Sequence, residues 1–288
     1  MKAIFCRELK SYFTGITGYV FAAFMLIFAG IYTMAYNLSG NYANFEYVLS
    51  AISFIYLIGV PILSMRVLAD EKRQKTDQLL YSLPIRLSDV VLGKYLAMVV
   101  VTLVPIAIMG LYPLILSQFG NVYLPAAYGS LVAFFLLGAA LLSIGMFISS
   151  VTENQVTSAV ITLIVMLLLY FITALASFVS TDGASSLIAL CVVALVFAAI
   201  VYLLTRNYVF ASLVGIVLIG ALIIWYSVSP SAFSSLFPTL MKQLSLFDRF
   251  DAFVDGVFDL TGIVYFLSVI GVFLFLSTQS LEKRRWSE

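Results

Sequence analysis

Residues 70–94, DEKRQKTDQLLYSLPIRLSDVVLGK, interrupt long apolar runs with the only extended, strongly charged stretch inside this chain. Each ionised side chain of this stretch would cost roughly 2.5–3.5 kcal/mol at the centre of a bilayer. The stretch must therefore face water, whereas the segments on both sides have the length and apolar character of membrane spans. This alternation predicts an all-α polytopic membrane protein.

The composition supports the same class. Of the 288 residues 63% are hydrophobic and only 10% are charged, with a mean hydropathy of +1.11. Soluble proteins carry about 25% charged residues, so the chain belongs in a lipid bilayer. The net charge of +1 gives no signal of nucleic-acid binding. Two cysteines, Cys6 and Cys191, make no disulfide framework and are interpreted as packing thiols.

The chain lacks the motifs of an enzyme. It has no histidine, so no Cys/His metal site can be written. The pair Gly93-Lys94 is followed by Tyr95 and has no glycine five residues earlier, so the phosphate loop GxxxxGK[ST] is missing. GxSxG and HExxH are also absent from the sequence. We therefore expect no cofactor in this chain, and any nucleotide energy must come from a partner subunit.

Eight apolar runs meet the requirement of about 20 residues for crossing a bilayer. They cover residues 16–36, 48–65, 95–117, 126–149, 156–179, 187–204, 208–226 and 261–278. The sixth and seventh runs form a tight hairpin around residues 205–207. Before the first run, residues 1–14 read as an interfacial amphipathic helix, although Glu8 falls on its apolar side.

Lysine and arginine set the orientation. With the N-terminus inside, 13 of the 15 basic residues lie on the cytoplasmic side, and only Lys242 and Arg249 lie outside. This bias predicts that segment 70–94 and both termini are cytoplasmic.

The long outer segment, residues 227–260, predicts an amphipathic helix on the outer leaflet. Its acids stand three or four residues apart and invite a calcium hypothesis, but the phenylalanines between them favour a solvated helix face. These acids are Asp248, Asp251, Asp255 and Asp259.

No predicted span carries a charge in its middle, which argues against ion-coupled transport. Pro105 and Pro113 predict a kink in the third span that serves movement or packing. Small residues predict close helix contacts in the fourth and seventh spans. These residues are Gly138, Ser143, Gly145, Ala211 and Gly215.

The charged segment itself combines helix signals with an apolar cluster. Thr76 is a plausible N-cap with Asp77 in the first turn, and Pro84 ends the helix after Leu83. Leu79, Leu80 and Leu83 could insert into a groove of a soluble partner. The alternative is a plain solvated loop.

Two stretches carry a resemblance to a known family. The first holds Glu71, Thr76, the pair Leu79-Leu80, Pro84 and then Gly93-Lys94, and the second is FVDGVFDLTGIVYFLSVIGVFLFLSTQSLEKRRW at residues 253–286. With the amphipathic N-terminus, they make the chain similar to permeases of the type-2 ABC exporter family, in particular its gliding-motility-type (GldF-like) branch. A glycine commonly precedes the threonine in that family, whereas Lys75 does so here.

The resemblance implies one permease domain over residues 1–288, with six core spans plus the extra hairpin and an elbow helix at residues 1–14. It implies a second permease copy or a related permease, and a cytoplasmic ABC ATPase that binds ATP and Mg²⁺. The coupling helix that contacts this ATPase would lie within segment 70–94, with Glu71, Thr76, Asp77, Leu79, Leu80, Leu83 and Pro84 at the interface. An auxiliary membrane protein with a large extracytoplasmic domain often accompanies the GldF-like branch.

The sequence therefore predicts the permease subunit of an ATP-driven exporter in a bacterial cytoplasmic (inner) membrane, moving a lipid-linked or amphiphilic substrate. The alternative is a non-transporting mechanotransmitter or scaffold that drives an extracytoplasmic partner protein. A third reading, an intramembrane enzyme, is disfavoured by the missing histidine and by the absence of acids in the middle of a span.

Overall fold

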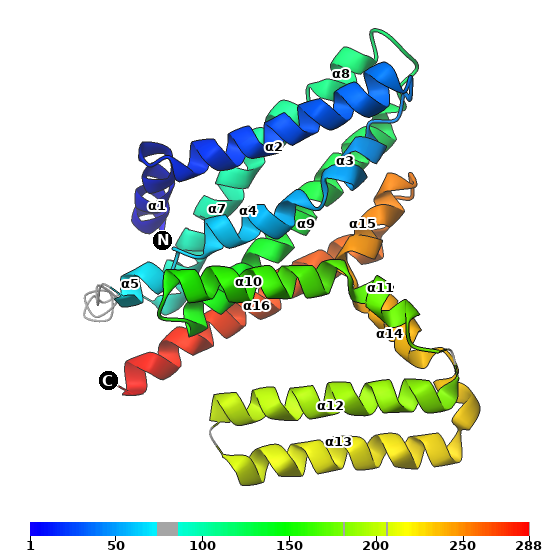
Figure 1. The fold of residues 1–288 in the computed structure, drawn as a ribbon. Helices are drawn as coiled ribbons and strands as arrows, with labels where there is room; N and C mark the ends of the chain where they lie inside the picture. Colours follow the sequence, from blue (N-terminus) through cyan, green and yellow to red (C-terminus); the bar gives the residue numbers. More distant parts are fainter. Residues whose placement is uncertain (74–85, 181, 206, 288) are drawn as a thin grey trace. The chain divides into compact units, whose positions relative to one another are not determined.

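A computed structural model describes residues 1–73, 86–180, 182–205 and 207–287. These residues form helices joined by short turns, with no β-strand among them (Figure 1). The prediction of an all-α protein is therefore confirmed. The chain divides into two compact units, one of Met1–Tyr170 with Arg249–Glu288 and the other of Phe171–Asp248.

The first unit starts with α1 (Lys2–Thr14), α2 (Thr17–Thr33) and the π-helix η1 (Met34–Ser39), which continues α2. It also holds most of α15 (Leu246–Val254). Its other helices are α3 (Glu46–Ile52), α4 (Ile55–Ser64), α5 (Ala69–Arg73), α7 (Leu87–Met109), α8 (Tyr112–Leu116), α9 (Leu124–Val151), α10 (Gln155–Tyr170) and α16 (Leu260–Ser287).

Helix α9 forms the core of the first unit. It packs against α4, α7, α10 and α16, and most of its side chains are buried. The hydroxyls of Tyr56 and Tyr95 donate hydrogen bonds to its backbone carbonyls at 2.9 and 3.0 Å. A Cβ placed at Gly138 would lie 2.5 Å from the Tyr56 hydroxyl, and one at Gly145 would lie 2.5 Å from Ser64 Oγ. The predicted close approach at these two glycines is confirmed.

Two predicted spans are interrupted. The second is divided between α3 and the helical stretch that follows it, with a bend of 60°. The fifth is divided between α10 and α11 (Ile172–Ser177) of the second unit. In the third, Pro105 lies inside α7, and Pro113 occupies the first turn of α8, where a missing backbone N–H costs little.

In the second unit α12 (Gly183–Thr205) and α13 (Tyr208–Val228) pack together as a hairpin, as predicted. The Asn207 side chain caps α13 by accepting from the backbone N–H groups of Val209 and Phe210. The close contact expected at Gly215 is made with Ala198 of α12. The unit continues through η2 (Pro230–Phe233) and α14 (Leu236–Leu244).

The amphipathic helix predicted within residues 227–260 is divided into α14 and α15. Ser245 between them is extended, and its hydroxyl accepts from the Asp248 backbone N–H at 3.1 Å. A serine followed three residues later by an acid starts a new helix, which explains the break.

Five helices in the described residues are long and apolar enough to cross a membrane, or six if the bent pair forms one span. Two further apolar stretches, α10 and residues 183–199, are shorter than this. The chain is a multi-pass membrane protein, and the count of eight spans stays a prediction.

Candidate functional site

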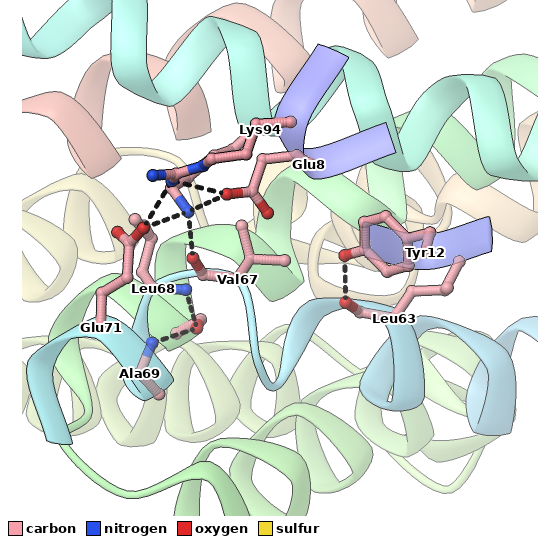
Figure 2. A network of polar contacts seen from close by, with 10 residues as sticks. Glu8, Tyr12, Leu63, Val67, Leu68, Ala69, Glu71 and Lys94 are labelled. Atoms are coloured by element: carbon pink, nitrogen blue, oxygen red, sulfur yellow. Dashed lines mark hydrogen bonds and ion pairs between the residues drawn. The ribbon is translucent and has the colours of Figure 1, made fainter. Parts of the chain in front are cut away.

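A buried lysine joins the beginning and the end of the charged segment. Lys94 lies two turns into α7, and only 1% of its side chain is exposed. Its Nζ donates to Glu8 Oε1 of α1 at 2.9 Å and lies 2.9 Å from Glu71 Oε1 of α5. It also donates to the Val67 carbonyl at 2.9 Å, and Figure 2 shows the three acceptors around the ammonium group. Lys94 therefore ties together α1, α5 and α7.

Arg7 completes this group, which we call the Lys94 cluster (Arg7, Glu8, Glu71 and Lys94). The Arg7 side chain is 60% exposed, and its Nη2 lies 2.9 Å from Glu8 Oε1 and 3.1 Å from Glu71 Oε1. Two cations thus face two carboxylates. Removal of one partner from a buried ion pair costs about 3–5 kcal/mol because it leaves a charge without compensation.

The cluster shifts the ionisation of its members. Burial acts to raise the pKa of Glu8, but the charge and hydrogen bond of Lys94, together with those of Arg7, hold it below its ordinary value. The hydrogen bond to Glu8 raises the pKa of Arg7, against a smaller opposing effect of burial. Glu8 is therefore ionised near neutral pH.

The backbone between α4 and α5 is held by the end of α9. Ser149 Oγ accepts from the backbone N–H groups of Leu68 and Ala69 at 3.2 and 3.1 Å. The buried Lys72 Nζ donates to the Ser150 carbonyl, to which Ser280 of α16 also donates at 3.1 Å. The residues just before position 74 are thus fixed to α9 and α16 as well as to Lys94.

Helix α1 makes two further contacts with the bundle. The buried Tyr12 hydroxyl donates to the Leu63 carbonyl at 2.9 Å, and burial raises the pKa of this tyrosine (Figure 2). A Cβ at Gly93 would lie 3.3 Å from the Ile4 side chain, so the glycine lets α1 approach α7. These contacts place Glu8 against Lys94.

A cavity of about 160 Å³ opens beside the cluster. Arg66 lies at its wall, donates to Thr17 Oγ1 at 2.5 Å and lies 3.8 Å from the Asp70 carboxylate. The other lining residues include Glu8, Ser11, Tyr12, Glu71 and Lys94. The cavity is polar and belongs to the same site.

Of the residues predicted at the coupling interface, the structure describes one. Glu71 lies in α5 and joins the Lys94 cluster. The others fall in residues 74–85, outside the described residues, so the coupling helix stays a prediction. These are Thr76, Asp77, Leu79, Leu80, Leu83 and Pro84.

Sequence reasoning did not find the partnership of Glu8 with Lys94. One signal was present, since Glu8 interrupts the apolar side of an amphipathic helix. The structure gives the reason, because Glu8 faces a buried ammonium group rather than lipid or water. Lys94 itself entered the sequence analysis as a basic residue and as part of the pair Gly93-Lys94, with no partner predicted for it.

Two of the acids near α15 have structural roles. Asp251 binds Ser50 Oγ at 3.2 Å, and Asp259 caps α16 by accepting from the backbone N–H groups of Thr261 and Gly262. No group of three or more His, Cys, Asp or Glu in the described part of the chain is placed to hold a metal ion. The calcium hypothesis for these four acids gains no support.

A family model described as "ABC-2 family transporter protein" matches residues 31–225, more than half of the chain. The chain belongs to the ABC-2 transporter family. Members of this family are membrane subunits of ABC transporters that work with a cytoplasmic ABC ATPase, and they are typically not enzymes themselves. No curated protein matches the chain.

The family match places the site within a transporter subunit. The matched residues 31–225 include Glu71 and Lys94, whereas α1 with Arg7 and Glu8 precedes the matched residues. An ABC-2 membrane subunit needs a route by which events in its ATPase reach the membrane helices. The Lys94 cluster joins α5 and α7, the two helices that precede and follow residues 74–85 of the charged segment.

Proposed function

We propose that this ABC-2 family chain is the permease subunit of an ATP-driven exporter of the gliding-motility-type (GldF-like) branch. It lies in a bacterial cytoplasmic membrane with eight spans and both termini inside. The sequence of segment 70–94 and of residues 253–286 supports the branch, and the distribution of Lys and Arg supports the orientation. ATP and Mg²⁺ are bound by the partner ATPase.

The observation that carries the proposal is the Lys94 cluster. The coupling segment around Thr76–Leu83 binds the ATPase, and its two flanks end in Glu71 and Lys94, whose charged atoms are 2.9 Å apart. Because separation of these charges inside the protein is costly, the two flanks and α1 move as one body. Closure of the ATPase would thus displace α1 and α7 together.

Helix α1 serves as the elbow helix of the permease. Most of its residues are exposed, yet Tyr12 and Glu8 fasten it to the bundle through buried contacts. A second permease copy completes the path for a lipid-linked or amphiphilic cargo. The wide apolar surface of α12 and α13 is in keeping with a lipid setting.

A second candidate function is a mechanotransmitter that uses the same ATPase cycle to drive an extracytoplasmic partner without cargo. The ion pairs that link α1, α5 and α7 suit this role equally, since they would transmit movement both to an export path and to an extracytoplasmic partner. Stimulation of the ATPase of the purified complex by amphiphilic cargo would favour export. A steady ATPase rate that changes only with an extracytoplasmic partner would favour mechanotransmission.

The test is recovery of an ATPase with the tagged chain from detergent-solubilised native membranes. We expect an ABC ATPase with the parent and its loss with Leu79→Asp and Leu80→Asp, because a buried carboxylate would be unpaired in an apolar groove. Gln78→Asp is the matched control, since it adds the same charge beside Leu79 and Leu80 without removing an apolar side chain.

Two results would contradict the proposal. One is the absence of any ATPase under conditions that keep the complex intact. The other is equal recovery with all four chains, which would place the ATPase contact outside Leu79 and Leu80.

A further inference from the structure

A buried glutamate lies at the start of α3, beyond the π-helix that continues α2. Glu46 is 4% exposed, and its Oε1 accepts from Asn44 Nδ2 at 2.7 Å. Among the residues that the structure describes, its Oε2 has no hydrogen-bond partner and no lysine or arginine forms an ion pair with it. A buried carboxylate without a compensating group is costly, so an external cation or donor is expected here.

A second oxygen acceptor without a donor belongs to the same network. Asn37 of η1 is 7% exposed, and its Nδ2 donates to the carbonyls of Tyr42 and Asn44 at 2.7 and 3.3 Å. These two bonds fix the orientation of the amide, because the flipped form would place its oxygen against two carbonyl oxygens. The amide Oδ1 is therefore an acceptor, and it too has no hydrogen-bond partner in the described part of the chain.

The backbone around this network is unusual. Residues Met34–Ser39 form a π-helix, a conformation that is rare and is found often at functional sites. Asn41 adopts a left-handed conformation with φ of 56°, and the loop then returns so that two of its carbonyls face Asn37. The chain thus departs from regular helix in the segment that holds Asn37 and leads to Glu46.

A second carboxylate contacts α3. Ser50 lies one turn after Glu46 on α3, and its hydroxyl binds the carboxylate of Asp251 at 3.2 Å. The donor set near Glu46 consists of carboxylate, amide and backbone oxygens. Oxygen ligands of this kind suit hard cations, whereas zinc or copper would require Cys or His.

We propose that Asn37 Oδ1 and Glu46 Oε2 bind a hard metal cation of the Na⁺ or Ca²⁺ class, with Asn44 as the residue that orients the Glu46 carboxylate. The cation compensates the buried charge and pins the loop between η1 and α3. This site is independent of the proposed export function, because it rests on groups at the other end of α2.

The experiment compares the thermal unfolding of the purified full chain in three salts of equal ionic strength. The salts are NaCl, CaCl₂ and N-methyl-D-glucamine chloride, whose large cation cannot enter the site. We expect a saturable rise of the unfolding midpoint with Na⁺ or with Ca²⁺, and the two arms identify which cation binds. Glu46→Gln should abolish this rise, and Asn44→Ala should weaken the cation affinity about 10- to 100-fold.

Asp255→Asn is the matched control, because it neutralises an exposed carboxylate and should keep the full response. Isothermal titration calorimetry of the parent with the stabilising cation checks the stoichiometry. Equal unfolding of the parent in all three salts would overturn the proposal and leave water as the partner of both oxygens. A response that persists in Glu46→Gln would also overturn it.

Discussion

The two ends of α2 contact buried polar groups that differ in how their charges are compensated. Thr17 at the start of α2 lines the cavity beside the Lys94 cluster, where two carboxylates meet two cations. Asn37 in η1, roughly 30 Å along the helix axis, lies in a network where Glu46 meets no cationic side chain of the described chain.

The difference separates a structural role from a binding role. At the Lys94 cluster the chain supplies both signs of charge, so the site is complete and holds three helices together. At Glu46 the described residues supply one amide donor but no cation, and Oε2 is left without a donor among them, so the site is completed from outside. Four substitutions or conditions can break or sharpen this comparison.

Lys94→Met should have the largest effect. It keeps most of the length of the side chain but leaves Glu8 and Glu71 without their buried partner, at an expected loss of about 3–5 kcal/mol in the free energy of unfolding. Denaturant titration of the purified chain measures this loss. Lys10→Met, at an exposed position of α1, should change stability by less than about 0.5 kcal/mol. Near-equal stability of the two variants would show that the cluster is not structural.

Gly138→Ala tests the packing of α4 on α9 within the unit that holds both sites. The added Cβ would lie 2.5 Å from the Tyr56 hydroxyl, and overpacking of this kind costs about 1–3 kcal/mol. Gly129→Ala on the same helix adds a Cβ with no atom within 4 Å and should be neutral or slightly stabilising. The same unfolding assay compares them, and a stable Gly138→Ala chain would contradict the close packing of α4 on α9.

Glu46→Gln should act in the opposite direction from Lys94→Met. In a buffer without small metal cations it removes an uncompensated buried charge, so we expect a gain of about 1 kcal/mol in the free energy of unfolding. The measurement is denaturant titration in N-methyl-D-glucamine chloride. A loss as large as that of Lys94→Met would mean that Glu46 has a partner inside the protein.

Acid should weaken the Lys94 cluster by the smallest amount. The pKa of Glu8 is lowered in the folded chain, so the folded state binds fewer protons than the unfolded state. Glutamates of the unfolded chain titrate at about pH 4.3. The contribution of Glu8 is present in full above this pH and is lost as the pH falls through the folded pKa. Unfolding midpoints of the parent and of Glu8→Gln should therefore converge in acid, and a constant difference would contradict the ion pair.

Local patterns allowed much of the fold to be predicted. Apolar runs indicated the helices, the short break at residues 205–207 marked the hairpin, and small residues marked the contact faces of α9 and α13. The division between α14 and α15 was missed because the apolar spacing runs across Ser245, where a short capping motif restarts the helix.

The candidate site could be predicted only in part. Glu71 belongs to a recognisable stretch, but its meeting with Glu8 and Lys94 joins three helices that are distant in sequence. Glu46 was overlooked because it precedes an apolar run and looks like a loop charge, whereas α3 packs against α2 and α9 and the side chain is buried. Tertiary contacts of this kind leave no periodic trace in a single sequence.

The order of the Lys94 cluster along the chain bears on biogenesis. Glu8 and Glu71 precede Lys94, so both carboxylates have been synthesised before the lysine leaves the ribosome. A nascent chain that ends before residue 94 carries two acids whose buried partner does not yet exist. Emergence of α7 supplies that partner, so docking of α1 and α5 can begin while the remaining helices are still being translated.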